Sequence, residues 1–271
     1  MQKEAENILN YYIRSWNLIC EGEGILTHSS IIQPVLYDGT KSVLKIPFSA
    51  EEKRGNKLMT WWDGVGAAKV LKYDDGAILM ERITGNRTLK AMVSDNRDEE
   101  ATRIICRIAS LLHSHKKEPL PELTPLNIWF GELFLSAGKY GSIFAESAAI
   151  ASSLLKDQRN VTVLHGDLHH DNILFSAEKG WLAIDPKGLW GEETFDYVNI
   201  LCNPDKQTAL SKDRLNEQIN IIVRETGTDR RHLLKWTIAW AGLSATWFIN
   251  DNLDASLPLG VAEIVLRELN N

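Results

Sequence analysis

Features that define several large classes of protein are missing from this 271-residue chain. Its three cysteines lie far apart without a CxxC pair, which argues against a disulfide framework or a zinc ribbon. The first residues, MQKEAENILNYYIRSW, lack the apolar core of a signal peptide, and no later stretch has the apolar length of a membrane span. We therefore expect a cytoplasmic protein with no membrane partner.

The motifs of other enzyme classes are missing as well. The chain has no GxxxxGK[ST] phosphate-binding loop, no GxSxG nucleophile turn and no GxGxxG loop. Its formal charge is -6, which argues against a nucleic-acid partner because such a surface needs clustered lysine and arginine. A cationic small molecule suits an acidic protein better.

The N-terminal third of the chain alternates short apolar runs with turn residues. A helix is predicted over residues 3–16, and Asp38-Gly39 is typical of a tight hairpin turn. The loop 21–30 contains Gly22 and Gly24, which would let the backbone approach a ligand, although a plain turn explains them equally. The pattern predicts strands over 18–20, 31–36 and 42–46, a helix over 50–62, and strands over 68–72 and 77–82.

After Ile83 the apolar spacing becomes helical. Long helices are predicted over 98–115, 140–155, 213–224, 230–250 and 261–269. The segment 161–184 interrupts them with two strand-like runs, 172–175 and 181–184, around a hairpin turn. We therefore predict an N-lobe of residues 1–83 and a C-lobe of residues 84–271.

The interrupting segment carries the residues that point to chemistry. His165, Asp167, Leu168 and Asn172 have the spacing of a kinase catalytic loop, in which the aspartate accepts a hydroxyl proton and the asparagine holds Mg²⁺. Asp185 follows thirteen residues after Asn172, in a place to hold the metal as well. Phosphoryl transfer needs such oxygen ligands together with one carboxylate aimed at the nucleophile.

The reaction also needs a cation on the phosphates, and Lys45 is the candidate. It lies between apolar neighbours in the third predicted strand, where an unpaired charge is costly. The position resembles that of the lysine on the third strand of kinases. The following helix offers Glu52, or failing that Glu51, as its ion-pair partner.

The run HGDLHHDNILF followed by WLAIDP resembles the aminoglycoside-phosphotransferase branch of the kinase-like superfamily, in which HGD replaces HRD. The blocks Gly180 to Gly188 and Glu192 to Asp196 are most similar to streptomycin 6-phosphotransferases and to aminoglycoside or hydroxyurea resistance kinases. The chain differs from protein kinases in having Asp185-Pro186-Lys187 where DFG would stand, and in having no APE segment.

This resemblance implies an α+β, bilobal protein-kinase-like fold. A small N-lobe would contain a five-stranded antiparallel sheet, a larger C-lobe would be mainly helical, and ATP would lie between them. The backbone from Glu81 to Ile83 would form the hinge that binds adenine, with Met80 near the gatekeeper position. Lys45, Glu52, Glu81 and Ile83 are thus predicted cofactor-binding residues.

The resemblance also implies the reaction. The enzyme would transfer the γ-phosphoryl group of ATP to a hydroxyl of a cationic aminoglycoside, with streptomycin and its 6-hydroxyl first. Asp167 would be the catalytic base, and Asn172 and Asp185 would hold Mg²⁺. Two alternatives stay open: a metabolic kinase of the choline, homoserine or fructosamine type, and a pseudokinase that binds nucleotide without turnover.

Other residue groups have two interpretations each. His165, His169 and His170 suggest a zinc site, but His165 also suits hydrogen bonds to the backbone of the catalytic loop. Trp236, Trp240 and Trp247 suit either a sugar-binding cleft or the core-facing stripe of a helix. Six acidic residues either clasp the substrate or lie in solvent, namely Glu192, Glu193, Asp196, Asp205, Asp251 and Asp254. For Asp196 the resemblance favours a role in bracing the catalytic loop.

Overall fold

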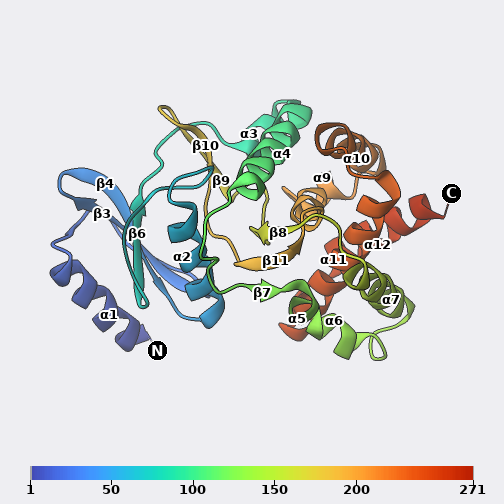
Figure 1. The fold of residues 1–271 in the computed structure, drawn as a ribbon, viewed down its shortest axis with the longest axis horizontal. Coiled ribbons are helices and arrows are strands. Elements are labelled where there is room, and N and C mark those ends of the chain that lie inside the picture. The colour runs from blue at the N-terminus through green and yellow to red at the C-terminus, as the bar shows by residue number, and fades with distance from the viewer. Residues whose placement is uncertain (1, 271) are drawn as a thin grey trace.

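The computed structural model describes residues 2–270, so Met1 and Asn271, the outer ends of the two predicted lobes, lie outside the described residues. An antiparallel sheet forms the N-terminal side of the molecule, and helices form most of the remainder (Figure 1). The termini lie at opposite ends of this arrangement.

The sheet contains six strands in the order β1-β3-β4-β6-β5, and β2 pairs with β3. All of its pairings are antiparallel. The strands are β1 (Ile19–Cys20), β2 (Ile25–Leu26), β3 (Ser30–Tyr37), β4 (Thr40–Pro47), β5 (Val70–Asp74) and β6 (Ala77–Glu81). The sequence predicted five strands. The sixth is the two-residue β2, which lies inside the predicted loop 21–30 and is too short to give an alternating pattern.

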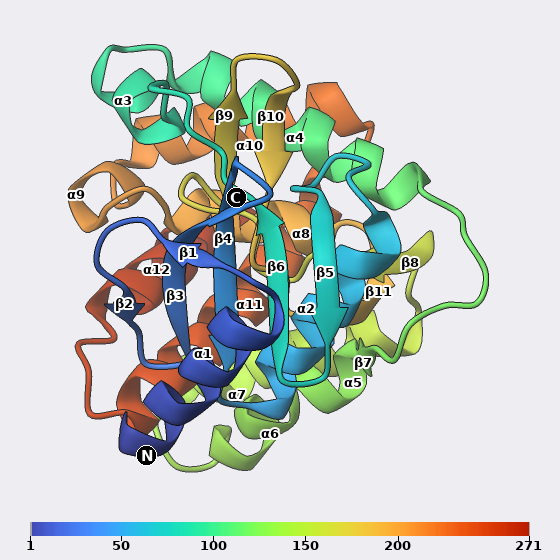
Figure 2. The same cartoon turned by 90° about the vertical axis from the view of Figure 1, so that its left-hand side faces the viewer.

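The two faces of the sheet have different environments. Helix α1 (Gln2–Ser15) crosses the outer face, where Tyr12 packs with Leu44 and Ile46 (Figure 2). Helix α2 (Ala50–Trp62) belongs instead to the main core shared with the C-terminal helices. Because side chains alternate along a strand, Lys45 lies on the face opposite to its neighbours Leu44 and Ile46.

The C-terminal part is built around one buried helix. Helix α11 (Arg230–Asn250) packs against α7 (Ser142–Lys156) and α12 (Ser256–Leu269), and most of its side chains are buried. A helix that is apolar on all sides belongs in a core. The other helices are α3 (Leu89–Ser94), α4 (Asp98–Ser114), α5 (Leu126–Trp129), α6 (Gly131–Ser136), α8 (Phe195–Val198), the 3-10 turn η1 (Asn199–Cys202), α9 (Lys206–Ala209) and α10 (Lys212–Thr226).

Two small sheets lie between these parts. The hairpin β9 (Ile173–Ser176) and β10 (Gly180–Ala183) corresponds to the two predicted strand-like runs. A second sheet joins β7 (Thr124–Pro125), β11 (Leu189–Glu192) and β8 (Val161–Leu164), and the sequence did not predict it. The predicted helix 261–269 begins five residues earlier, at Ser256. Pro258 is tolerated there because the first helical turn needs no amide donor.

Backbone hydrogen bonds connect the two parts of the molecule. The Ala68 amide donates to the carbonyl of Ala183 at 3.0 Å, and the Ala183 amide donates to the carbonyl of Gly66 at 2.9 Å. The segment after α2 is thereby attached to β10. None of the helices within residues 2–270 combines the length and the apolar character needed to cross a membrane.

Candidate active site

Two cavities meet where the sheet faces the catalytic-loop segment. The sheet-side cavity, of about 400 Å³, lies between the sheet, α2 and the β9–β10 hairpin. Half of its lining side chains are apolar. It is lined by Thr27, Ser29, Ser30, Ile32, Val43, Lys45, Asn56, Met59, Ala68, Met80, Glu81, Arg82, Ile83, Asn172, Leu174, Ile184, Asp185 and Pro186. Five of the seven predicted site residues are in this set.

Lys45 is the buried cation of the sheet-side cavity, with 6% of its surface exposed. Its ammonium forms ion pairs with Glu52 and Asp185. Ser49 caps α2 by accepting the Glu52 amide at 3.2 Å, which fixes the helix start and so aims Glu52 at the lysine. A buried ammonium is tolerated only with such partners. Burial by itself would raise the pKa of Asp185, but the charge of Lys45 holds it below its usual range.

The predicted hinge begins at Glu81, the last residue of β6, and lines the sheet-side cavity. The carboxylate of Glu81 accepts the Lys69 amide at 2.7 Å and pairs with Lys179, so its side chain is already engaged. The Ile83 amide has no hydrogen-bond partner among residues 2–270. Adenine offers acceptors of the kind that such a free amide can bind.

The oxygen atoms of Asn172 and Asp185 suit a magnesium ion. The Asn172 side chain donates through Nδ2 to the backbone carbonyl of Asp167 at 2.8 Å, which leaves its Oδ1 free to act as a ligand. Asp185 has a left-handed backbone, φ 60°, and keeps one carboxylate oxygen beyond the one that pairs with Lys45. Mg²⁺ binds one or two such protein oxygens and takes its other ligands from phosphates and water. The residues present therefore fit this ion.

The three histidines of the loop do not support a zinc site. Within residues 2–270, no three His, Cys, Asp or Glu side chains are grouped as metal ligands. His165 instead accepts the Asp167 amide through Nδ1 at 3.2 Å, and its Nε2 lies 2.9 Å from the carbonyl of Ile184. Burial lowers the pKa of His165, which keeps the ring neutral. The predicted contact between this histidine and the loop backbone is present.

Asp196 holds the loop from beneath. Its fully buried carboxylate accepts the backbone amides of His165 at 2.8 Å and Gly166 at 2.7 Å, and His113 lies 2.8 Å away. Burial by itself would raise the pKa of Asp196, but the hydrogen bond from His113 and its charge hold it below its usual range. Gly166 has φ 84°, and a Cβ there would come within 2.8 Å of Leu189. Glycine is therefore required between His165 and Asp167.

Asp167 points out of this loop into the second cavity. Asn199 donates to one of its carboxylate oxygens at 2.8 Å and Asn172 to the other at 3.2 Å, so two amides fix the orientation of the carboxylate. The side chain keeps 28% exposure on the cavity side. Desolvation raises its pKa to about 7, against the opposing effect of the nearby Lys187 charge.

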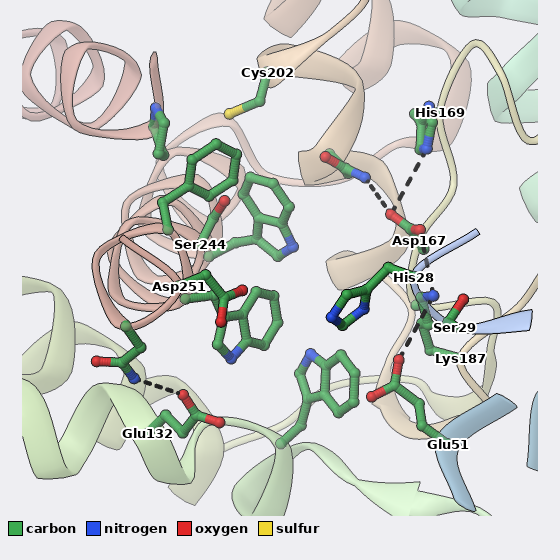
Figure 3. A pocket seen from close by; sticks show the side chains of 18 of the residues that line it. His28, Ser29, Glu51, Glu132, Asp167, His169, Lys187, Cys202, Ser244 and Asp251 are labelled. Carbon is green, nitrogen blue, oxygen red and sulfur yellow. Dashed lines mark hydrogen bonds and ion pairs between the residues drawn. The ribbon is translucent and has the colours of Figure 1, made fainter. Parts of the chain in front are cut away.

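The helix-side cavity, of about 880 Å³, begins at Asp167 and extends toward α11 (Figure 3). Its wall holds more carboxylates than cations. It is lined by His28, Ser29, Phe48, Ser49, Glu51, Glu52, Trp129, Glu132, Gly166, Asp167, His169, Lys187, Asn199, Cys202, Asn203, Trp240, Ser244, Trp247, Phe248, Asn250, Asp251, Leu257 and Pro258. Asp167, Lys187 and Glu51 lie on one side of this cavity, and Glu132 and Asp251 lie on the other. Ser29 lines both cavities.

The three tryptophans of α11 differ in position: one lies in the core and two line the helix-side cavity. Trp236 is fully buried, and its indole donates to Glu192 at 2.9 Å, so it belongs to the core. Trp240 and Trp247 line the helix-side cavity. Trp247 meets Trp129 edge to face with 5.3 Å between the ring centroids. The cleft therefore has an aromatic wall made from two helices.

The family of the chain follows from comparison with known proteins. The family model described as aminoglycoside/hydroxyurea antibiotic resistance kinase matches residues 15–252, which is most of the chain. The chain belongs to this kinase family. The resemblance predicted from HGDLHHDNILF and WLAIDP is thus confirmed.

Two curated relatives of this kinase are named as streptomycin kinases. Streptomycin 3''-kinase of Klebsiella pneumoniae is 45% identical over 264 residues, covering 94% of this chain and 99% of the relative. Streptomycin 6-kinase of Streptomyces griseus is 29% identical over 269 residues, covering 93% and 86%. One similar solved structure is a thermostable mutant of aminoglycoside phosphotransferase APH(4)-Ia in a ternary complex with ADP and hygromycin B. Its alignment covers 95% of this chain and 97% of that one, with a TM-score of 0.65 and 11% sequence identity. That likeness confirms the kinase-like fold.

Several residues of the helix-side cavity were not predicted from the sequence to be site residues. Lys187 was noted only as part of the run that replaces DFG, although its ammonium lies 3.9 Å from the carboxylate of Asp167. Burial by itself would lower the pKa of Lys187, but the surrounding carboxylates raise it above its usual range. No sequence pattern marked Asn199, Glu132 or Trp129 as site residues, because the packing of the C-terminal helices alone brings them to the cavity.

The six acidic residues that the sequence offered as candidate substrate ligands have different environments in the structure. Glu192 is buried and paired with His232, so it is a core residue. Asp205 caps α9, and Asp254 pairs with Lys206 at the surface. Asp251 is the member of the set that lines the helix-side cavity.

Proposed function

We propose that the chain transfers the γ-phosphoryl group of ATP to a hydroxyl group of streptomycin in the cytoplasm. One observation carries this proposal: Asp167, in the helix-side cavity, is hydrogen-bonded to Asn172, which lines the sheet-side cavity. A base for an acceptor hydroxyl thus lies beside a ligand for the metal of a nucleotide. Kinases require this juxtaposition.

The sheet-side cavity is the proposed nucleotide site, between an N-lobe of residues 1–83 and a C-lobe of residues 84–271. Its apolar lining suits the adenine ring, the free amide of Ile83 and the neighbouring backbone of Glu81 would bind the ring edge, and Lys45 would contact the phosphates while Glu52 holds it. The segment from Thr27 to Ser30 supplies hydroxyls at the end of this cavity that adjoins the helix-side cavity.

Asn172 and Asp185 would hold Mg²⁺ in this site. The ion, when bound, neutralises charge on the phosphates. Asp167 would orient the acceptor hydroxyl and accept its proton, and the amides of Asn172 and Asn199 fix the carboxylate for this task. The hydroxyl oxygen would then form its bond to the γ-phosphorus.

The helix-side cavity suits a large polycation. Its volume of about 880 Å³ fits a molecule of several rings, and its carboxylates outnumber its one lysine. Glu132 and Asp251 lie across the cavity from Asp167 and suit guanidinium groups, while Trp240 and Trp247 offer flat apolar surface. Streptomycin combines guanidinium groups with sugar rings.

The 3''-hydroxyl is the position we favour. The identity of 45% with a streptomycin 3''-kinase, against 29% with a streptomycin 6-kinase, supports it. The 6-hydroxyl, predicted from the blocks Gly180 to Gly188 and Glu192 to Asp196, is the second candidate.

The test is phosphorylation of streptomycin by the purified chain with ATP and Mg²⁺, followed by assignment of the modified hydroxyl by NMR. We expect one monophosphorylated product at the 3'' position, and a product at the 6 position would favour the second candidate. Turnover with choline, homoserine or a fructosamine but not with streptomycin would favour a metabolic kinase. ATP binding without turnover on any of these alcohols would favour a pseudokinase.

A resistance assay provides the cellular counterpart. Expression in a sensitive bacterium is expected to raise its tolerance of streptomycin, while the Asp167→Asn variant, expressed at the same level, is not. Equal tolerance of streptomycin with the wild type and with Asp167→Asn would contradict the proposal that phosphorylation by this chain causes resistance.

A further inference from the structure

Lys187 occupies the junction of the two cavities. Its Nζ lies 3.5 Å from a carboxylate oxygen of Glu51, 3.5 Å from one of Glu52 and 3.9 Å from one of Asp167. It is the one lysine or arginine among the described residues that line the helix-side cavity. Its side chain keeps 19% exposure, so the ammonium is accessible to a molecule bound there.

Glu52 connects this lysine with the cation of the other cavity. Oε2 of Glu52 pairs with Lys45, and Oε1 lies near Lys187. Two ammonium groups therefore flank one buried carboxylate, one in each cavity. Lys45 is held by ion pairs with Glu52 and Asp185.

The ammonium of Lys187 has no such close partner. It makes no hydrogen bond within residues 2–270, and the three carboxylates lie beyond ordinary hydrogen-bonding distance. A lysine has three donors, and leaving them unused is costly in a partly buried site. An anion entering between Asp167 and Lys45 would meet these donors.

The backbone that carries Lys187 is held in place. The Lys187 amide donates to the carbonyl of His165 at 2.7 Å, which attaches it to the catalytic loop. On the other side, a Cβ on Gly55 of α2 would come within 2.0 Å of the carbonyl of Pro186, so only glycine allows the helix to pack this closely. The lysine therefore projects from a fixed base, which lowers the entropic cost of aiming its ammonium.

We propose that Lys187 is a catalytic residue that donates to a non-bridging oxygen of the phosphoryl group during its transfer; this inference rests on the proposed kinase function. In that step the acceptor oxygen forms a bond to the γ-phosphorus, and the bond from this phosphorus to the bridging oxygen breaks. The electron pair of the broken bond leaves on ADP, and the hydroxyl proton passes to Asp167. Lys187 neutralises oxygen charge on the side of the acceptor, while Lys45 acts on the side of the nucleotide.

The test compares Lys187→Gln with Lys187→Arg and with a matched control, Lys206→Gln. Lys206 is an exposed lysine that pairs with Asp254 outside both cavities. A cation that acts on the transferred group is worth on the order of 100-fold in kcat. We therefore expect about 100-fold lower kcat for Lys187→Gln, KM values for ATP and streptomycin within about threefold, partial rescue by arginine and no change in the control.

A second measurement separates a catalytic role from a structural one. ADP with aluminium fluoride imitates the transferred group, and we expect the wild type in the presence of streptomycin to bind this mixture more tightly than ADP alone. Lys187→Gln should lose that gain while its affinity for ADP and its melting temperature stay unchanged. Equal weakening of both complexes, or kcat within about threefold of wild type, would overturn the proposal.

Failure of the proposed substrate would be recognised separately. If the wild type does not phosphorylate streptomycin, the same variants are compared in the hydrolysis of ATP by water, which develops the same charge on the phosphoryl oxygens. A drop of about 100-fold for Lys187→Gln against Lys206→Gln would still support the lysine, and equal hydrolysis rates would overturn it.

Discussion

The two cavities of this kinase differ in how the chain builds them. The sheet-side cavity is small, half of its lining side chains are apolar, and the lining comes from short segments of the sheet, of α2 and of the chain around the β9–β10 hairpin. The helix-side cavity is about twice as large and acidic, and its residues come from widely separated segments that run from His28 to Pro258. The proposed nucleotide site is thus specified largely by local patterns, whereas the proposed acceptor site depends on how distant helices pack.

The largest effect on kcat is expected for a change at Asp167. Asp167→Asn should lower kcat about 1000-fold, because it removes the proposed base for the hydroxyl proton. The affinity for ADP should stay within about twofold of wild type, since Asp167 lines the helix-side cavity only. Steady-state kinetics and calorimetry measure the two effects.

The matched control for that variant is Asp213→Asn, an exposed aspartate of α10. It should have wild-type kinetics. Loss of ADP affinity in Asp167→Asn to the same extent as kcat would show that the two cavities do not act separately.

Asp196 belongs to neither cavity but braces the loop between them, so its loss should appear in stability. Asp196→Asn should lower the free energy of unfolding by about 3 kcal/mol at neutral pH, because a buried carboxylate is removed from His113 and from two loop amides. Urea unfolding followed by tryptophan fluorescence measures the change.

The same pair of proteins tests the lowered pKa of Asp196. A carboxylate with a lowered pKa in the folded state adds stability that is fully present above its ordinary pKa of about 4 and is lost as the pH falls below that value. The difference between wild type and Asp196→Asn should therefore shrink between about pH 5 and about pH 3. A constant difference over this range would show that the charge of Asp196 is not the source of its contribution.

Glu132 sharpens the comparison from the acceptor side. Glu132→Gln should raise KM for streptomycin about tenfold, the value of one charge-assisted hydrogen bond, and leave KM for ATP unchanged. Glu263→Gln, an exposed residue of α12, is the control. An equal rise in both KM values would contradict the assignment of the helix-side cavity to the acceptor.

The smallest effect is expected at the hinge. Glu81→Gln should change KM for ATP by less than about twofold, because the Glu81 side chain is engaged with the Lys69 amide and Lys179, and only its backbone is proposed to bind adenine. Glu178→Gln, on the exposed turn of the β9–β10 hairpin, is the matched control. A tenfold rise in KM for Glu81→Gln alone would show that the side chain itself binds the nucleotide.

Much of the sheet-side cavity was predictable because its residues lie close together in the sequence or follow alternation. The spacing of Asn172 and Asp185 is fixed by one hairpin, and a lysine between apolar residues of a strand must find a partner. The sequence favoured Glu52 over Glu51 as that partner, and the structure pairs Lys45 with Glu52. The cap at Ser49 sets the start of α2 and so aims Glu52 at the lysine.

The amino-acid sequence alone determined the kinase-like fold, the family and the segments that carry the proposed chemistry, because short-range spacing encodes strands, helices and catalytic loops. The tertiary structure decided that Trp236 is a core residue while Trp240 faces the cleft, since both positions on α11 fit one apolar stripe. It also decided that Lys187 meets Asp167. The Lys187 amide donates to the carbonyl of His165, which attaches the lysine to the catalytic loop through a contact between distant segments that no local pattern records.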